Sequence, residues 1–174
     1  MKIHGPNRKL ILIFSLLTAL LAPPLSGCRG PLVLLPGGAL QGEKAEAPAD
    51  WSFTNEIEVI QLETNPSEPY SVNLWVIGIE QDLYVHAGTS RAQWIENMEA
   101  NPRVRLQVND SIYELVASRV VTQDEFDRFM VAYVEKYGNY PRNRVIGEVY
   151  LYRLVVPDSA SQVSRDQASL LAAS

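Results

Sequence analysis

Apolar and polar positions alternate, or run together in short apolar stretches, in a way that predicts six strands. Alternation is nearly regular in EIEVIQL, residues 56–62, as is typical of a strand with one buried face. Other strands are predicted where β-rich stretches end at turn residues such as Asn65-Pro66 and Asn109-Asp110. Their ranges are 70–79, 83–87, 103–108, 111–121 and 145–156.

Two helices are predicted between these strands. Ser90 and Gln93 have the spacing of a capping box, which predicts a helix that starts at Ser90 and ends near residue 100. Thr122 and Glu125 repeat that spacing, and Gly138 suits the C-terminal cap of the helix that follows. The apolar stripe of this second helix has a helical period and comprises Phe126, Phe129, Met130, Tyr133, Val134 and Tyr137.

The order of elements favours a mainly β fold of the α+β class. Three strands, a helix, two strands, a helix and a last strand follow one another with mostly short connections. Hairpin-linked strands are antiparallel, and a small barrel removes their exposed edges. We therefore predict an antiparallel six-stranded barrel with two helices over residues 51–157, followed by a mobile tail rich in Ser, Ala and Gln at 158–174.

Residues 1–27 have the pattern of an export signal. A positive start is followed by 13 apolar residues from Leu10 to Ala22; a bilayer span needs about 20. The sequence Leu25-Ser26-Gly27-Cys28 then resembles the lipobox of bacterial lipoproteins. That resemblance implies cleavage before Cys28, acylation of its sulfur, and a lipid-anchored domain on the extracytoplasmic side of the cell envelope. The alternative is an ordinary cleaved signal with an incidental cysteine.

The same resemblance bears on which membrane holds the protein. An Asp after the cysteine favours the inner membrane in this family, and here Arg29 follows, which favours the outer membrane of a Gram-negative host. Residues 28–50 are rich in Pro and Gly and lack periodicity, so we expect a flexible tether. Its apolar patch, residues 32–35, is expected either against the lipid or on the domain.

Charge and composition exclude several classes of function. The chain has 15 Lys and Arg against 20 Asp and Glu, and loss of the basic signal makes the balance more negative, which argues against nucleic-acid binding. One Cys and two His cannot supply a zinc site by ligand spacing. The sequence patterns of P-loops, dinucleotide folds and serine hydrolases are absent. Catalysis would therefore need a bound redox cofactor.

Residues 83–121 carry a resemblance to a known superfamily. A strand ends at Thr89-Ser90-Arg91, a short helix carries Trp94 and Asn97, and the sequence ANPRV, residues 100–104, leads into the next strand. Together these features resemble the flavin-binding split-barrel superfamily, which includes pyridoxamine phosphate oxidases and deazaflavin-dependent nitroreductases. The resemblance implies a split β-barrel, a homodimer, and FMN or a deazaflavin bound along the dimer seam.

The resemblance also implies a cofactor site. A Ser-Arg-Lys run holds the flavin phosphate in the oxidases, and Ser90-Arg91-Ala92 matches it without the lysine. Arg91 suits a phosphate, Thr89 and Ser90 offer hydroxyls, and the start of the following helix attracts anions. His86 and Trp94 complete the candidate cofactor-binding residues. His86 is otherwise a structural strand residue and Trp94 a core residue, while Trp75 is expected in the core or at the dimer interface.

Two functions remain open from the sequence. One is a membrane-anchored oxidoreductase that depends on FMN or a deazaflavin. Its candidate flavin-lining residues are Tyr133, Tyr137, Tyr140, Tyr150 and Tyr152, although the helical stripe explains the first two without a ligand. The other is a non-enzymatic envelope lipoprotein whose cofactor-free barrel binds a protein or a small ligand. Haem is one such ligand, with His86 as its candidate contact. The absorbance spectrum of the protein distinguishes these functions.

Overall fold

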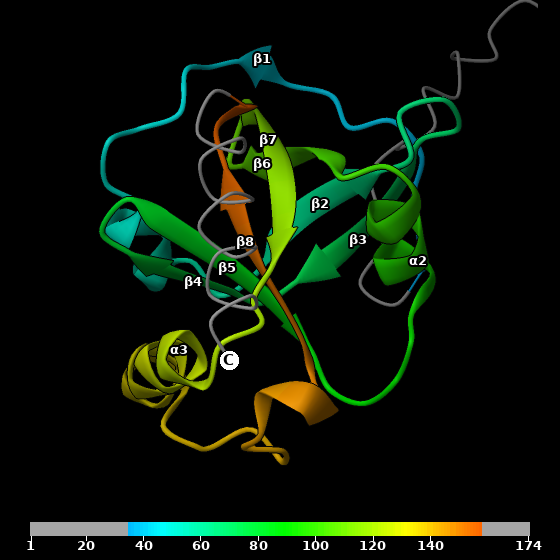
Figure 1. Cartoon of the computed structure of the whole chain (residues 1–174). Helices are drawn as coiled ribbons and strands as arrows, with labels where there is room; N and C mark the ends of the chain where they lie inside the picture. The colour runs from blue at the N-terminus through cyan, green and yellow to red at the C-terminus, as the bar shows by residue number, and fades with distance from the viewer. Residues whose placement is uncertain (1–34, 158–174) are drawn as a thin grey trace, which may run out of the picture.

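One curled sheet and two α-helices form the part of the chain that the computed structural model describes, residues 35–157 (Figure 1). The strands are β1 (Glu43–Lys44), β2 (Ile60–Thr64), β3 (Tyr70–Leu74), β4 (Val76–Ile79), β5 (Asp82–Ala87), β6 (Arg103–Val108), β7 (Ser111–Arg119) and β8 (Tyr150–Val155). The helices are α2 (Gln93–Ala100) and α3 (Gln123–Tyr137), with short 3-10 helices η2 (Ser52–Glu56) and η3 (Ile146–Glu148). None of the helices within residues 35–157 is long and apolar enough to cross a membrane.

The two end strands of the curled, open sheet follow one another along the chain. Its strand order is β3-β2-β6-β7-β8-β5-β4, with antiparallel neighbours throughout, and β1 adds a parallel pair to β7. The two end strands, β3 and β4, are separated only by Trp75. Counted as one strand, they give the six antiparallel strands expected from the sequence. The prediction of a mainly β split barrel with two helices is confirmed.

Side chains, rather than another strand, satisfy the outer edge of β4. The amide group of Asn55 bonds both the N–H and the carbonyl of Gly78, at 3.0 and 2.8 Å. The Tyr137 hydroxyl bonds Val76 in the same way, at 3.2 and 3.1 Å. A side chain at Gly78 has no room, because a Cβ there would lie 2.1 Å from the carbonyl oxygen of Trp51. An unpaired strand edge is thereby covered.

Residues 37–45, a segment we name the strap, run along the barrel. Gly37 pairs with Ser71 of β3, and Glu43 and Ala45 donate to carbonyls on β7 and the turn before it. Leu40 is 1% exposed, and its N–H donates to a Glu63 oxygen at 2.6 Å. The sequence led us to expect a flexible tether as far as residue 50, but these contacts fix the chain from Gly37 onward. Cys28, the signal sequence and the tail at 158–174 lie outside the described residues.

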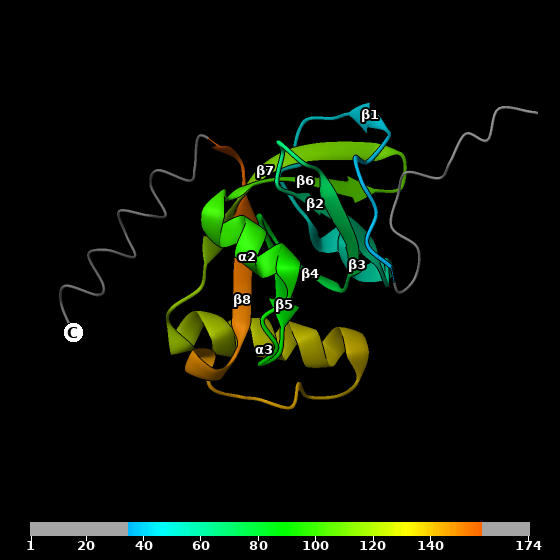
Figure 2. The ribbon, with the colours of Figure 1, turned by 90° about the vertical axis from the view of Figure 1, so that its right-hand side faces the viewer.

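The apolar residues form two layers, one on each side of the sheet. Inside the barrel, Trp94, Ile95 and Met98 of α2 pack against the inward faces of the strands. Outside it, α3 packs across β4, β5 and β8, so that the two helices lie on different sides of the sheet (Figure 2). Tyr84 and Phe129 are fully buried between α3 and the sheet.

Only part of the predicted helix capping is present. α2 starts at Gln93, with Ala92 as its N-cap and no side-chain capping bond, so the capping box at Ser90 is wrong. Gln93 donates instead to Asn97 within the helix, at 3.1 Å. Thr122 is the N-cap of α3 as predicted, although its side chain makes no capping bond. Gly138 caps the end of α3 with a φ of 70°, which confirms that prediction.

Candidate functional site

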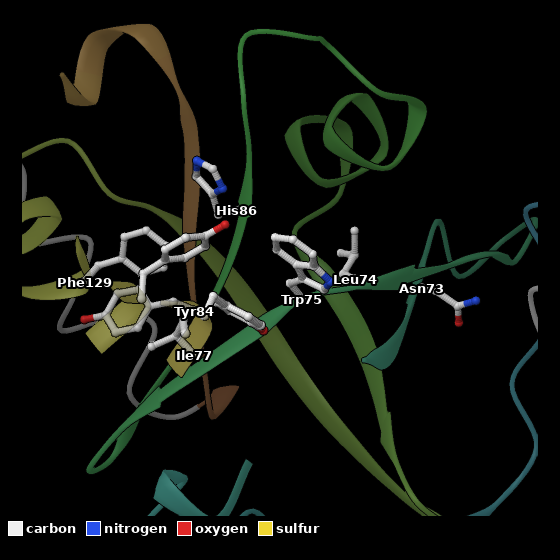
Figure 3. Close-up of a pocket in the computed structure, with 9 residues that line it drawn as sticks. Asn73, Leu74, Trp75, Ile77, Tyr84, His86 and Phe129 are labelled. Carbon is white, nitrogen blue, oxygen red and sulfur yellow. The ribbon is translucent and has the colours of Figure 1, made fainter. Parts of the chain in front are cut away.

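A pocket of about 250 Å³ opens between the sheet and the second half of α3, where Trp75 divides β3 from β4 (Figure 3). Its lining residues are Asn73, Leu74, Trp75, Ile77, Tyr84, His86, Phe129, Tyr133 and Tyr137. Among these residues there is no Asp, Glu, Lys or Arg. A pocket with aromatic walls and no charged side chain suits an uncharged, flat ligand group.

Two periodicities bring the aromatic walls together. Tyr84 and His86 are two apart on β5, so both face α3, and the α3 rings recur at intervals of four residues. His86 and Phe129 lie on one side of the pocket and Trp75 on the other (Figure 3). Trp75 is 48% exposed and stacks on Tyr137 with ring centroids 4.7 Å apart and planes 20° apart. The indole therefore forms a flat wall that remains open to solvent.

His86, one of the lining residues, has a buried polar atom that lacks a partner. Its Nε2 is buried and has no hydrogen bond within the described part of the chain. The imidazole lies against the rings of Phe129 and Tyr133, with centroids 5.6 and 6.0 Å away. Burial lowers the pKa of His86 to about 4, so the side chain is neutral at pH 7. An unsatisfied buried polar atom costs about 1–3 kcal/mol, a cost that a ligand hydrogen bond would remove.

A polar network fixes Tyr84 from behind the pocket. The Tyr84 hydroxyl accepts from Arg128 at 2.6 Å and donates to Glu125 at 3.1 Å. Arg153 lies 3.3 Å from Glu125 and 3.7 Å from Asp82, which also pairs with Arg128. Burial, followed by the nearby carboxylates, raises the pKa of Tyr84 well above its usual range. The network balances two acids with two guanidinium groups and holds Tyr84 as a neutral, immobile wall.

The predicted phosphate loop lies between β5 and α2 and is exposed. Thr89, Ser90 and Arg91 are all exposed. Arg91 pairs with two carboxylates of α2, Glu96 at 3.4 Å and Glu99. A phosphate would have to displace these acids to reach the guanidinium. The loop therefore offers the expected residue types, but its cation is already neutralised.

Trp94 lies in the barrel interior. It is 5% exposed and meets Tyr152 edge to face, with centroids 6.4 Å apart. Of the five residues expected at a cofactor, His86 alone lines the pocket. The sequence analysis did not place Tyr84 or Phe129 at a site. The pattern that could have indicated them is that Tyr84 on β5 and Phe129 on α3 lie on faces that turn toward each other. The α3 stripe was interpreted as core packing.

A flavin-type cofactor fits this arrangement at one end. About 250 Å³ accommodates a planar ring system but not a nucleotide-sized molecule, because complete ligand sites run to roughly 300–1,000 Å³. The aromatic walls and the free Nε2 of His86 suit such a ring. The site for the cofactor's phosphate lacks a free cation, since Arg91 is paired with Glu96 and Glu99.

Comparison with known proteins gives a family likeness for part of the chain. Among solved structures, a putative pyridoxamine 5'-phosphate oxidase from Listeria innocua is 15% identical, with a TM-score of 0.47 over 57% of this chain and 84% of that one. A conserved hypothetical protein from Mycobacterium tuberculosis is 21% identical, with a TM-score of 0.49 over 60% and 76%. The heme storage protein HutZ from Vibrio cholerae is 18% identical, with a TM-score of 0.47 over 60% and 84%.

These structural likenesses are too distant to carry an argument about function. No curated protein matches the sequence. Residues 80–147, however, match the family model described as F420H(2)-dependent quinone reductase. Over that segment the chain resembles a family of deazaflavin-dependent enzymes, in agreement with the split-barrel resemblance seen in the sequence.

Proposed function

We propose that this domain binds the ring of a deazaflavin or of FMN in the pocket beside α3, and that it is an oxidoreductase. One observation carries the proposal. The segment that matches the quinone reductase family, residues 80–147, contributes five lining residues of that pocket. They are Tyr84, His86, Phe129, Tyr133 and Tyr137. The part of the chain with a family likeness is therefore the part that builds most of the pocket wall.

The chemistry of the proposal divides between cofactor and protein. A bound flavin or deazaflavin would supply hydride or electron transfer, which no side chain of the protein provides. The indole of Trp75, backed by its stacking on Tyr137, would offer a flat face to the ring, while Phe129 and Tyr133 would exclude water from the ring's other side. The pocket tyrosines stay protonated at pH 7 and are weaker acids than a free tyrosine, because burial raises the pKa of Tyr137 to about 12 and also raises that of Tyr133.

The phosphate end of the cofactor is assigned to Thr89, Ser90 and Arg91. Arg91 is exposed and its partners Glu96 and Glu99 are half exposed, so exchanging them for a phosphate changes the free energy by only about 0–1 kcal/mol per pair. This exchange supports weak rather than tight holding of the phosphate. We also propose that Cys28 is acylated and anchors the domain to a membrane. Cys28→Ser should then release the processed protein from the membrane fraction.

Cofactor binding is tested by titrating the purified protein with FMN and, separately, with a deazaflavin, following absorbance and Trp fluorescence. Trp75→Ala should weaken binding by about tenfold, since stacking on a base-sized ring contributes roughly 1–3 kcal/mol. Val131→Ala, on the solvent side of α3 and 71% exposed, is the matched control and should bind normally. A wild-type protein that takes up neither cofactor contradicts the proposal.

A second function is supported by the pairing of Arg91 with Glu96 and Glu99. A barrel that has lost its phosphate contact would act as a non-enzymatic binding protein for an uncharged ring or for a partner. Haem is a separate candidate, for which His86 would be the contact to the iron, and a haem titration that gives no Soret shift excludes it. Retention of a flavin through gel filtration would count against the cofactor-free function.

A further inference from the structure

The Nε2 atom of His86 is buried and has no hydrogen-bond partner within the described part of the chain, which is unusual for a polar group. His86 lies near the end of β5, pairs with Leu151 of β8 through the backbone, and turns its ring toward α3. Within residues 35–157 two buried side-chain nitrogens lack partners, His86 Nε2 and Arg153 Nε, and only His86 lines the pocket. Two other lining residues already use their hydroxyls in hydrogen bonds. Tyr84 bonds Arg128 in its polar network, and Tyr137 bonds Val76.

The groups around His86 determine what it can bind. Tyr84 lies on the same face of its strand, and the rings of Phe129 and Tyr133 lie against the imidazole from α3. The remaining lining residues are also uncharged. No carboxylate or cation contributes to the shift of its pKa, which burial alone lowers. The imidazole is therefore neutral at pH 7, and its Nε2 can donate or accept one hydrogen bond according to its tautomer.

From this geometry we infer that His86 is the specificity-determining residue of the pocket, and that its Nε2 selects an uncharged planar ring whose edge carries a carbonyl or ring nitrogen. The inference rests on the proposed function and deepens it. A ring with a polar edge gives Nε2 the partner that it lacks, whereas a purely hydrocarbon three-ring system leaves it unsatisfied. A charged edge is disfavoured, because no lining side chain would neutralise it.

The test compares two uncharged three-ring probes on the full chain, lumiflavin and the hydrocarbon phenanthrene, by fluorescence titration. Lumiflavin lacks the phosphate, so the Arg91 loop does not contribute. His86→Leu should weaken lumiflavin binding about tenfold and leave phenanthrene binding unchanged or tighter. His86→Gln keeps a hydrogen-bonding amide and should restore part of the lumiflavin affinity. Ile77→Val, a lining change without a polar atom, should alter both probes alike.

A second readout monitors the imidazole directly. The chain has two histidines, so the variant His4→Gln leaves His86 as the sole source of imidazole NMR signals. Lumiflavin should shift the Nε2 resonance, and phenanthrene should shift it much less. If lumiflavin binds but His86→Leu binds it equally well and the resonance does not move, the inference is overturned while the proposed function stands. If the wild type binds none of lumiflavin, FMN and the deazaflavin, both are overturned.

Discussion

The two α-helices cover the same sheet with opposite results. α2 inserts Trp94, Ile95 and Met98 into the barrel, and none of these side chains is more than 5% exposed. α3 lays a stripe of aromatic rings on the outer face and leaves a pocket of about 250 Å³ beside its second half. α2 therefore fills the barrel interior, whereas α3 forms one wall of a pocket.

The difference follows from ring geometry and from the bend at Trp75. Phe129, Tyr133 and Tyr137 meet at interplanar angles near 50°, so these flat, rigid groups cannot interlock as aliphatic chains do. Trp75 turns outward where the strand changes partner and cannot fill the gap. The comparison teaches that an aromatic stripe with helical spacing marks a closed core only when its neighbours can fill the angles between the rings.

The largest expected effect is on the closed side. Trp94→Ala should lower the free energy of unfolding by about 3–5 kcal/mol, because it removes a buried indole from the barrel interior. Urea denaturation measures this loss. Val131→Ala, on the exposed face of α3, should change stability by less than about 0.5 kcal/mol. A Trp94→Ala loss below about 1 kcal/mol would show that the barrel end is not tightly packed.

The second-largest loss of stability is expected when the polar network beside the pocket is broken. Arg153→Met removes the partner of Asp82 and Glu125, both largely buried, and should cost about 3 kcal/mol at pH 7. Lys44→Met breaks an exposed pair with Glu114 and should cost less than about 1 kcal/mol. Thermal denaturation of the two variants side by side distinguishes a network that fixes Tyr84 from ordinary surface pairing. Equal losses would contradict that role.

The pH dependence of stability should be somewhat smaller. Burial lowers the pKa of folded His86 to about 4 from 6.5, so the unfolded chain binds its proton first as the pH falls. Stability is therefore lost between about pH 6.5 and pH 4, by roughly 2–3 kcal/mol in total. The difference between wild type and His86→Leu across this range isolates the effect from titrating carboxylates. A constant difference would show that His86 is not buried in solution.

The smallest effect on stability should come from the exposed loop. Arg91→Ala should change the free energy of unfolding by less than about 0.5 kcal/mol, since its ion pairs are exposed. The same change should nevertheless weaken the binding of FMN several-fold. It should leave the binding of lumiflavin unaffected, because lumiflavin has no phosphate. Calorimetric titration with both ligands gives the comparison. A parallel loss of both would place Arg91 at the ring instead of the phosphate.

Local patterns were sufficient for the fold and insufficient for the site. Alternation and helical spacing predicted the strands and the α3 stripe, because both depend on neighbouring residues. The division of 70–79 at Trp75 has no Gly or Pro to announce it and arises from a change of pairing partner. The start of α2 was misplaced because the spacing of Ser90 and Gln93 does not reveal that Gln93 bonds Asn97. The pocket depends on contacts distant in sequence.

The strap limits how far the barrel can lie from the proposed lipid anchor. Gly37 is held on β3 by its pairing with Ser71, and eight residues lie between it and Cys28. The nine Cα-to-Cα steps reach at most about 30 Å when fully extended. If a lipid on Cys28 anchors the chain as we propose, the barrel stays within roughly its own width of the bilayer surface. Ligands that partition into or near the headgroups would then meet the pocket more often than ligands free in the surrounding fluid.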